Sequence, residues 1–408
     1  MQLLERAVSF AIALAICASA VGQAAPVAGQ AQEVARGTSW VSPYWGYSAP
    51  KLVFDGTRYY TPLLWGMSPN EARWAISTHS DGAWKVSSEH AGVYQPPVLL
   101  LDDEKRLIVI HNLEEKPPVI LRAKTAGDAE QFDVIAPPTD VANSYYIGAA
   151  IRGNRVYLAC VTIPSYSMLL TSLDLATGTW TPARVIAEGQ IETKPKTAWT
   201  YPMLVPVDGG VHVVASNCPD GGDGNTYNQL WHCFVPDDAA AEMSKAMILE
   251  GKIGCMTYAT DFVFDAAGGM HIVYMANMRK YGDVPPEGDG EPGLYHAYRE
   301  ANGTTWATGK VAPLCIGGFY RNGDALSLIT QEEATLFRYQ WNATTKAWDS
   351  REQLLAKEAI LAGPSFMDVV REESGSAPTP GIALVTDGLL APVADATAVR
   401  IVWSLLPG

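Results

Sequence analysis

The sequence predicts an all-β fold, a seven-bladed β-propeller of four-stranded antiparallel sheets, with six or eight blades as alternative counts. Three observations predict it. Units of strand, Gly- or Asp-rich turn and strand recur about every 50 to 60 residues, tryptophan-marked turns recur between them, and helical periodicity is almost absent. A chain of 408 residues has room for seven such units.

The repeats share an apolar strand, a turn and a second apolar strand. They begin at Ser48, Gln95, Tyr146, Tyr201, Thr260, Gly317 and, more weakly, Gly363. Each is expected to continue into a third and a fourth strand. We expect residues 36–47 to help close the ring, and residues 237–247 (D-D-A-A-A-E-M-S-K-A-M) to form a short helix.

Composition indicates an exported globular protein. The net charge is -14, with 48% apolar and 18% charged residues, so a basic nucleic-acid-binding surface is not expected. Residues 1–25 carry Arg6, an apolar stretch and cleavage candidates at Ala20 and Ala24, which predicts a signal peptide; a lipoprotein signal at Cys17 is the alternative. No later apolar run reaches the roughly 18 residues of a membrane span. We therefore expect residues 26–408 to form a single propeller domain, secreted or periplasmic and monomeric.

Five cysteines remain after the signal peptide, an odd number, and no C-x-x-C pair occurs. Export permits disulfides. Cys218 and Cys233 flank one loop, and Cys255 and Cys315 occupy similar places in successive repeats, so either pair could be bridged. At least one thiol is expected to stay free and buried.

The turns between third and fourth strands carry a family resemblance. S-T-H-S-D-G-A-W from Ser77, S-L-D-L-A-T-G-T-W from Ser172, Y-R-E-A-N-G-T-T-W from Tyr298 and Y-Q-W-N-A-T-T-K-A-W from Tyr339 resemble the BNR or Asp-box hairpin. This hairpin belongs to sialidase-like propellers, whose relatives include polysaccharide lyases. The resemblance spans roughly residues 48 to 408. It implies that the acidic or amide side chain binds turn amides while tryptophan packs between sheets.

Sialidase activity itself is not expected. The early R-I-P motif of sialidases is replaced by S-A-P-K, with Lys51. A serine hydrolase would need G-x-S-x-G, which does not occur. The resemblance therefore favours an exported propeller that acts on an extracellular polysaccharide.

Two histidines occupy matching places in second strands, His212 in V-D-G-G-V-H-V-V and His271 in A-A-G-G-M-H-I-V. Other repeats have Tyr59, Ile108 or Tyr157 at this place. A position shared with Tyr and Ile packs between sheets, so we expect both histidines to be structural.

Functional residues are expected at one mouth of the channel, where first strands start and second strands end. In the second repeat, His90 and Tyr94 precede the first strand, His111 ends the second, and Arg122 lies on the third; these four are the catalytic candidates. The substrate-binding candidates are Tyr145, Tyr146, Trp199, Tyr201, Tyr258, Asp261 and Arg279.

These residue types suit β-elimination in a uronate-containing glycan. Histidine or tyrosine can remove and return protons, and arginine can neutralise the carboxylate. Glycoside hydrolysis would need two opposed carboxylates, for which Asp261 and Asp368 are available without a spacing that pairs them. A glycan- or protein-binding propeller without chemistry would use the same aromatic residues, and a purely structural repeat protein would use none.

No cofactor is predicted, although calcium could bind Asp-Gly stretches in two long loops, from Ser216 and from Asn277. Their spacing does not match the D-x-[DN]-x-[DN]-G loop, so solvated turns are expected there. Arg279 and Lys280, in the second loop, could meet an anionic substrate.

Overall fold

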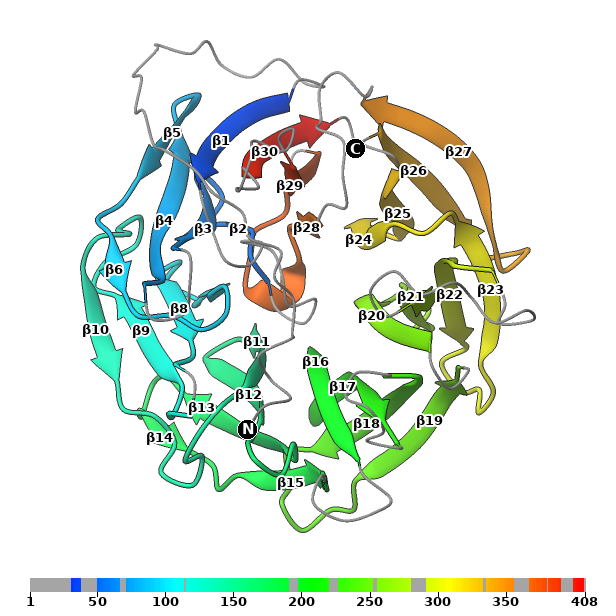
Figure 1. Ribbon diagram of the computed structural model, residues 1–408, viewed down its shortest axis with the longest axis horizontal. Helices are drawn as coiled ribbons and strands as arrows, with labels where there is room; N and C mark the ends of the chain where they lie inside the picture. Colours follow the sequence, from blue (N-terminus) through cyan, green and yellow to red (C-terminus); the bar gives the residue numbers. More distant parts are fainter. Residues whose placement is uncertain are drawn as a thin grey trace.

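A computed structural model of the chain describes residues 31–37, 50–66, 71–113, 115–190, 197–219, 227–251, 255–279, 291–332, 335–355, 367–379, 381–389 and 399–406. These residues form seven antiparallel sheets arranged as blades around a central axis (Figure 1). The predicted seven-bladed propeller is confirmed. The expected signal peptide, residues 1–25, lies outside the described residues.

The blades follow one another in sequence order, and in each the first strand lies nearest the axis. Blade 1 contains β2 (Val53–Phe54), β3 (Tyr59–Trp65), β4 (Arg73–Ser80), β5 (Ala83–Val86) and β6 (His90–Ala91). Blade 2 contains β7 (Val98–Leu101), β8 (Leu107–His111), β9 (Val119–Ala123) and β10 (Phe132–Ile135). Blade 3 contains β11 (Tyr146–Arg152), β12 (Arg155–Val161), β13 (Met168–Asp174), β14 (Thr179–Trp180) and β15 (Arg184–Ala187).

The second half of the ring repeats this pattern. Blade 4 contains β16 (Ala198–Val207), β17 (Gly210–Cys218), β18 (Gln229–Pro236) and β19 (Ser244–Glu250). Blade 5 contains β20 (Cys255–Phe264), β21 (Met270–Arg279), β22 (Gly293–Arg299) and β23 (Ala307–Ala312). Blade 6 contains β24 (Ile316–Asn322), β25 (Ala325–Glu332), β26 (Thr335–Asn342) and β27 (Ala347–Leu355). Blade 7 contains β28 (Met367–Val369), β29 (Ile382–Leu389), β30 (Val399–Leu406) and the N-terminal β1 (Ala31–Gly37), with a short 3-10 helix, η2 (Glu372–Ser374), after β28.

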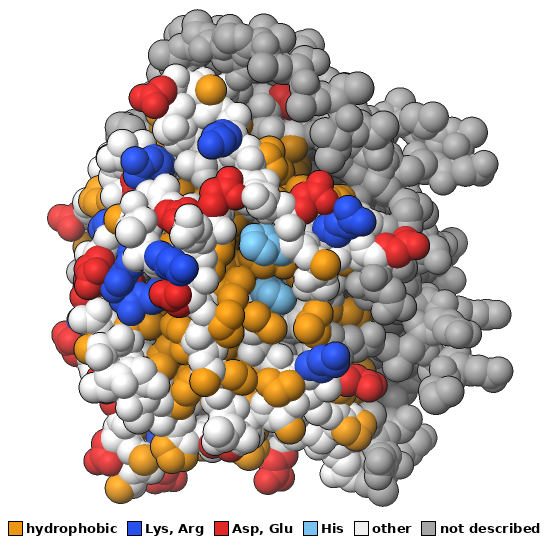
Figure 2. Space-filling view, turned by 90° about the vertical axis from the view of Figure 1, so that its left-hand side faces the viewer, with side chains coloured by type: hydrophobic (Ala, Val, Ile, Leu, Met, Phe, Trp, Pro, Cys, Tyr) orange, Lys and Arg blue, Asp and Glu red, His pale blue; other side chains and the backbone are white. Residues whose placement is uncertain are grey.

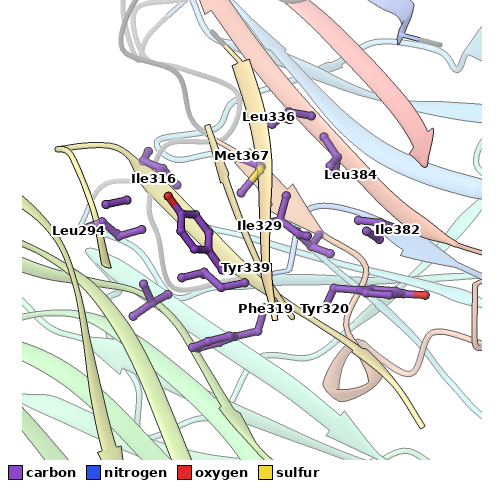
Figure 3. Packing of buried hydrophobic residues seen from close by; sticks show 14 of the residues in the cluster. Leu294, Ile316, Phe319, Tyr320, Ile329, Leu336, Tyr339, Met367, Ile382 and Leu384 are labelled. Atoms are coloured by element: carbon purple, nitrogen blue, oxygen red, sulfur yellow. The ribbon is translucent and has the colours of Figure 1, made fainter. Parts of the chain in front are cut away.

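The position of a strand in its blade explains its residue pattern. Inner strands are covered on both faces by neighbouring blades, so β7 reads V-L-L-L and is buried throughout. Outer strands face solvent, and β19 is mostly exposed. Figure 3 shows the packing between blades, with Leu336 of blade 6 beside Leu384 of blade 7.

The N-terminal strand closes the ring. β1 pairs with β30 as the outermost strand of blade 7, from Ala31 opposite Ser404 to Gly37 opposite Val399. The closing strand thus lies before most of the predicted segment 36–47, of which residues 38–47 are outside the described residues. Pairing of the first strand with the last repeat is a common way to bury the two edges that an open ring would expose.

The predicted helix at 237–247 is wrong. This segment is a turn followed by β19, because pairing with β18 outweighs the helix propensity of Ala, Glu, Met and Lys. Neither of the two disulfides that the sequence left open is present, since Cys160, Cys218, Cys233, Cys255 and Cys315 are all free and buried. The expected free, buried thiol is confirmed.

The hairpins between third and fourth strands have the expected geometry at two places. Asp174 Oδ1 accepts the amides of Ala176 and Thr177, and Asn342 Oδ1 accepts those of Thr344 and Thr345. Tryptophans from these hairpins pack between sheets; the ring of Trp84, for example, lies 5.9 Å from Trp403 of blade 7. These side chains stabilise the fold.

Residues 370–379, which we call the plug, connect β28 to β29 and extend across the ring axis (Figure 1). The plug binds three other blades. Lys105 Nζ of blade 2 donates to Gly375 O (2.9 Å), and Ala377 N donates to Phe54 O of blade 1 (2.7 Å). Arg371 reaches Asp261 of blade 5. Because first strands end on this side of the ring, the plug covers the lower face, and the opposite, upper face carries the starts of first strands.

Candidate functional site

Seven tyrosines gather on the upper face and form what we call the tyrosine cluster. They come from blades 2 to 5, at the starts of first strands and in the loops between second and third strands. The cluster consists of Tyr94, Tyr145, Tyr146, Tyr166, Tyr201, Tyr227 and Tyr258. The structure therefore brings together five of the residues predicted from sequence and adds Tyr166 and Tyr227, which the prediction missed.

The rings form a continuous series across the blades. Tyr94 and Tyr145 have ring centroids 5.3 Å apart, and the Tyr94 hydroxyl donates to that of Tyr145 at 3.1 Å. Tyr146 lies 4.5 Å from Tyr145 and 4.6 Å from Tyr201, which is 5.3 Å from Tyr258. Offset and edge-on contacts at these distances add stability beyond simple area burial.

Two members of the cluster sit in unusual backbone conformations. Tyr166 has φ of 55° and Tyr201 has φ of 50°, a left-handed region that bulky residues rarely adopt. Tyr201 lies in a bulge of β16, where the register shifts between Thr200 and Met203. Such strain costs about 1 to 3 kcal/mol per residue and concentrates at functional sites. Both strained residues direct their rings into the cluster.

Burial raises the pKa of two tyrosines of the cluster. It raises the pKa of Tyr146 well above the ordinary value, and neighbouring Tyr201 and Tyr227 add to the effect. The pKa of Tyr227 is raised for the same first reason. Six of the tyrosines are less than a tenth exposed and Tyr166 is partly exposed. The cluster is thus a set of largely buried rings and hydroxyl groups.

The catalytic histidine candidates lie together at the interface between blades 1 and 2. The ring of His90 stacks on Trp74 at 4.3 Å, and His111 lies 5.3 Å from the same indole. Figure 2, which views this side of the ring, shows histidine side chains set among apolar ones. His111 is 6% exposed.

His111 is a neutral imidazole in this setting. Burial, with a smaller effect from the nearby His90, lowers its pKa to about 4. Its Nδ1 makes no hydrogen bond to the part of the chain that the structure describes. Burial also lowers the pKa of His90. Burial thus favours the neutral form of both rings.

Tyr94 is on the other side of blade 2 from the histidines. Strand alternation turns His111 toward blade 1, whereas Tyr94 packs against Tyr145 of blade 3. The two are linked through the main chain, because Tyr94 N donates to Asn112 O at 2.8 Å. The predicted group of three therefore divides into a histidine pair and a tyrosine pair.

Arg122 does not join either pair. It lies opposite Ile108 in the register of β8 and β9, so it faces blade 3 rather than His111. Its guanidinium binds Asp102 Oδ2 at 2.8 and 2.5 Å, and Asp102 is fully enclosed. In the structure Arg122 stabilises the turn after β7.

Asp261 and Asp368 lie together in the channel, held by one arginine. Arg371 binds Asp261 Oδ1 at 2.5 Å and Asp368 Oδ1 at 3.1 Å. The remaining oxygens accept main-chain amides from Phe319 and from Lys51 and Leu52. Burial raises the pKa of Asp261 to about 6, against the attraction of Arg371. These carboxylates tie blades 5, 6, 7 and 1 together, and neither has the open setting that a glycosidase acid or nucleophile needs.

The other two candidates have different surroundings. Trp199 is buried beside Trp231, with Lys245 Nζ 4.6 Å from its ring centre, and its indole nitrogen donates to Glu188 O. Arg279 ends β21 on the upper face, and its side chain lies outside the described part of the chain, as does Lys280.

The two structural histidines predicted from sequence are confirmed. His212 Nδ1 lies 2.8 Å from His232 Nε2, and His271 Nδ1 lies 3.0 Å from His296 Nε2. Both pairs stack between blades. His271 has no exposed surface.

No group of three or more His, Cys, Asp or Glu side chains suited to a metal ion occurs among the described residues. The Asp-Gly stretches considered for calcium fall largely at 220–226 and 280–290, outside those residues. Within the described ranges, no helix reaches the length and hydropathy of a membrane crossing.

Comparison with known proteins identifies the fold. No protein-family model and no curated protein matches the sequence. Among solved structures, a polysaccharide lyase PL25 ulvan lyase bound to -[GlcA(1-4)Rha3S]- superposes with a TM-score of 0.64 and 14% identity, covering 92% of this chain and 95% of that chain. A second structure of a PL25 ulvan lyase gives 0.61 and 14%, covering 88% and 92%. Polysaccharide lyase Uly1 gives 0.61 and 10%, covering 88% and 90%. At these identities, the chain is similar to ulvan lyases in fold.

Proposed function

We propose that the upper face binds an extracellular polysaccharide and cleaves it by β-elimination at a uronate residue. The observation that carries this proposal is the tyrosine cluster, which draws seven hydroxyl-bearing rings from four blades to one face. Tyrosine suits sugars because its ring packs on C–H faces while its hydroxyl bonds to sugar hydroxyls. The strained backbone at Tyr166 and Tyr201 supports a functional role for the cluster.

In this proposal a histidine is the base and a tyrosine is the acid. Neutral His111, or His90 beside it, removes the proton next to the uronate carboxylate, and the bond to the leaving oxygen breaks as a carbon–carbon double bond forms. The leaving oxygen takes its proton from Tyr94 or Tyr145, and solvent restores both groups. Since Arg122 is paired with Asp102, Arg279 is the predicted neutraliser of the carboxylate.

The solved propellers of similar fold agree with this proposal. They include ulvan lyases, one of them bound to a GlcA-containing ligand. Export is part of the proposal as well, because a polysaccharide of this kind lies outside the cell.

A second candidate function is glycan binding without turnover. It is favoured by the separation of the histidine pair from the tyrosine pair on opposite faces of blade 2, and by the commitment of Arg122 to Asp102. A binding site needs the tyrosines alone, whereas an eliminase needs both pairs at one substrate.

The experiment is an elimination assay with the purified protein and a panel of uronate polysaccharides, read by the ultraviolet absorbance of the unsaturated product. We expect activity on at least one polymer. His111→Ala and Tyr94→Phe should each lower kcat by about 100-fold. Tyr339→Phe, which loses a buried tyrosine hydroxyl bonded to Glu332 in blade 6, should keep the activity.

Absence of product on every polymer, together with binding of one of them, would replace elimination by glycan recognition. Activity that survives both His111→Ala and Tyr94→Phe would place the chemistry elsewhere in the molecule.

A further inference from the structure

We infer that Asn112 is the positioning residue that sets the tyrosine pair Tyr94 and Tyr145. Its effect on turnover rests on the proposed function, but its effect on the geometry of the pair does not. The inference comes from the contacts of one buried amide at the interface of blades 2 and 3.

Asn112 contacts both tyrosines through their main chains. Its carbonyl oxygen accepts the amide of Tyr94 at 2.8 Å. Its side-chain Nδ2 donates to the carbonyl oxygen of Tyr145 at 2.8 Å and to that of Ser144 at 3.2 Å. The hydroxyls of the two tyrosines are 3.1 Å apart. A single residue therefore fixes the two backbone positions from which the hydroxyl pair is built.

The Asn112 side chain is suited to binding two buried main-chain carbonyls. Asn112 is 1% exposed, so its amide hydrogens have no competing water, and each is used on one carbonyl. Aspartate has the same shape but no donor when ionised. Alanine removes both of these hydrogen bonds to main-chain carbonyls, and lost hydrogen bonds are costly in an interior.

The neighbouring segment has anchors of its own, so loss of Asn112 should displace the pair without unfolding the blade. Ser144 N donates to Lys116 O at 2.9 Å, and Tyr145 N donates to Val161 O at 2.7 Å. These bonds fix the main-chain amides of residues 144 and 145, while Asn112 binds their carbonyl oxygens. Removing one of the two supports lets Tyr145 rotate away from Tyr94.

Asn112 also follows His111 directly, which connects the two halves of the proposed site. Strand alternation sends His111 toward blade 1 and Asn112 toward blade 3. A shift of Asn112 would thus move the base and the acid relative to each other. A misplacement of about 1 Å in an active site can cost roughly 100-fold in rate.

The test compares Asn112→Ala and Asn112→Asp with Gln340→Ala. Gln340 also donates its amide to a buried main-chain carbonyl, that of Leu326 at 2.9 Å, but in blade 6. The first readout is the carbon-13 NMR signal of the tyrosine ring carbon that bears the hydroxyl. It is recorded on protein labelled with carbon-13 tyrosine, without substrate. Tyr94→Phe and Tyr145→Phe assign the two signals.

We expect both Asn112 variants to shift the Tyr94 and Tyr145 signals and to leave that of Tyr339 unchanged, whereas Gln340→Ala shifts neither tyrosine of the pair. In the elimination assay, both Asn112 variants should lose roughly 10- to 100-fold in kcat with little change in KM. The carboxyl of Asn112→Asp can donate once protonated, so its kcat should recover partly at acidic pH, and that of Asn112→Ala should not.

A folded Asn112→Ala variant with unshifted Tyr94 and Tyr145 signals would overturn the inference. Shifted signals in a protein whose wild type eliminates no polymer would support the positioning role while refuting the proposed reaction. Equal losses of kcat in Asn112→Ala and Gln340→Ala would show a general effect of stability and would also overturn the inference.

Discussion

At the scale of single residues, the histidines show how one side chain serves the fold. All seven lie between blades or at blade edges. Asp265 Oδ2 lies 3.2 Å from His271 Nε2, so that nitrogen carries the proton and the opposite nitrogen accepts from His296. The second pair, His212 and His232, repeats the stacking in blade 4. Protonation of both rings of a pair would place two donors opposite each other and break the bond.

The buried histidines predict a loss of stability in acid. Burial lowers the pKa of both His212 and His271 to about 4, below the ordinary value near 6.5. The unfolded chain therefore binds more protons than the folded chain between these values, and the free energy of unfolding falls as the pH drops from about 6.5 toward 4. His271 alone contributes on the order of 3 kcal/mol. Urea unfolding at a series of pH values measures the slope.

Two substitutions distinguish the contribution of histidine packing to stability from that of histidine hydrogen bonding. His79 stacks on Trp403 at 4.6 Å, and its Nε2 has no hydrogen-bond partner in the described structure. His79→Phe should keep the stacking, raise stability by up to about 1 kcal/mol and flatten the pH slope. His271→Phe should instead destabilise the protein, because Asp265 and His296 each lose a hydrogen-bond partner. Equal effects of the two would contradict the assignment.

Residue roles at the mouth were only partly predictable from sequence. The repeat register places His111 and Tyr94 on the upper face. It does not show which neighbouring blade Tyr94 faces, because Tyr94 precedes its strand and the alternation of strand side chains does not extend to it. Tyr166 and Tyr227 lie in or beside loops, where no periodicity marks them. Their only signal is the position of those loops on the upper face. The pairing of Arg122 with Asp102 depends on a turn geometry that spacing does not show.

At the scale of elements, the plug stabilises the ring in addition to the closing strand β1. It joins blades 1, 2, 5 and 7 through main-chain bonds and Arg371. Gly375 makes the tightest approach. Its φ is 77°, and a Cβ there would lie 1.9 Å from Leu101 O. Only glycine meets both demands.

Gly375→Ala should therefore destabilise the protein by about 3 kcal/mol, from a backbone penalty plus a collision with a main-chain atom. Gly209→Ala is the matched control, because Gly209 has φ of 81° and a Cβ there would meet nothing within 4 Å. The control should cost about 1 kcal/mol. Thermal unfolding distinguishes them, and similar losses would mean that the plug is loosely packed.

Elements were predictable where a pattern reflects burial. Inner strands read as apolar runs because both faces are covered, and the seven repeats follow from them. The segment 237–247 was not predictable, since its residues favour a helix locally and the edge of β18 determines the outcome. The plug has no repeated counterpart, so no comparison between repeats could reveal it.

At the scale of the whole molecule, the contacts that hold the ring together lie at its closure and on its lower face. β1 closes the ring, and the plug joins four of its blades. The buried network of Lys51, Asp261, Asp368 and Arg371 links the inner strands of blades 5 and 7. Burial lowers the pKa of Lys51 to about 8. Removing one partner from a buried network of this kind typically costs about 3 to 5 kcal/mol. The lower face and the inner strands thus contribute to stability, and the proposed function places the ligand on the upper face.

The measurement that tests this account most directly is a crystal structure of the His111→Ala variant with a uronate oligosaccharide. We predict that the sugar lies on the upper face against the tyrosine cluster, with a glycosidic oxygen within hydrogen-bonding distance of Tyr94 or Tyr145. A sugar bound on the lower face beside the plug, or along the outer strands away from the tyrosines, would contradict it.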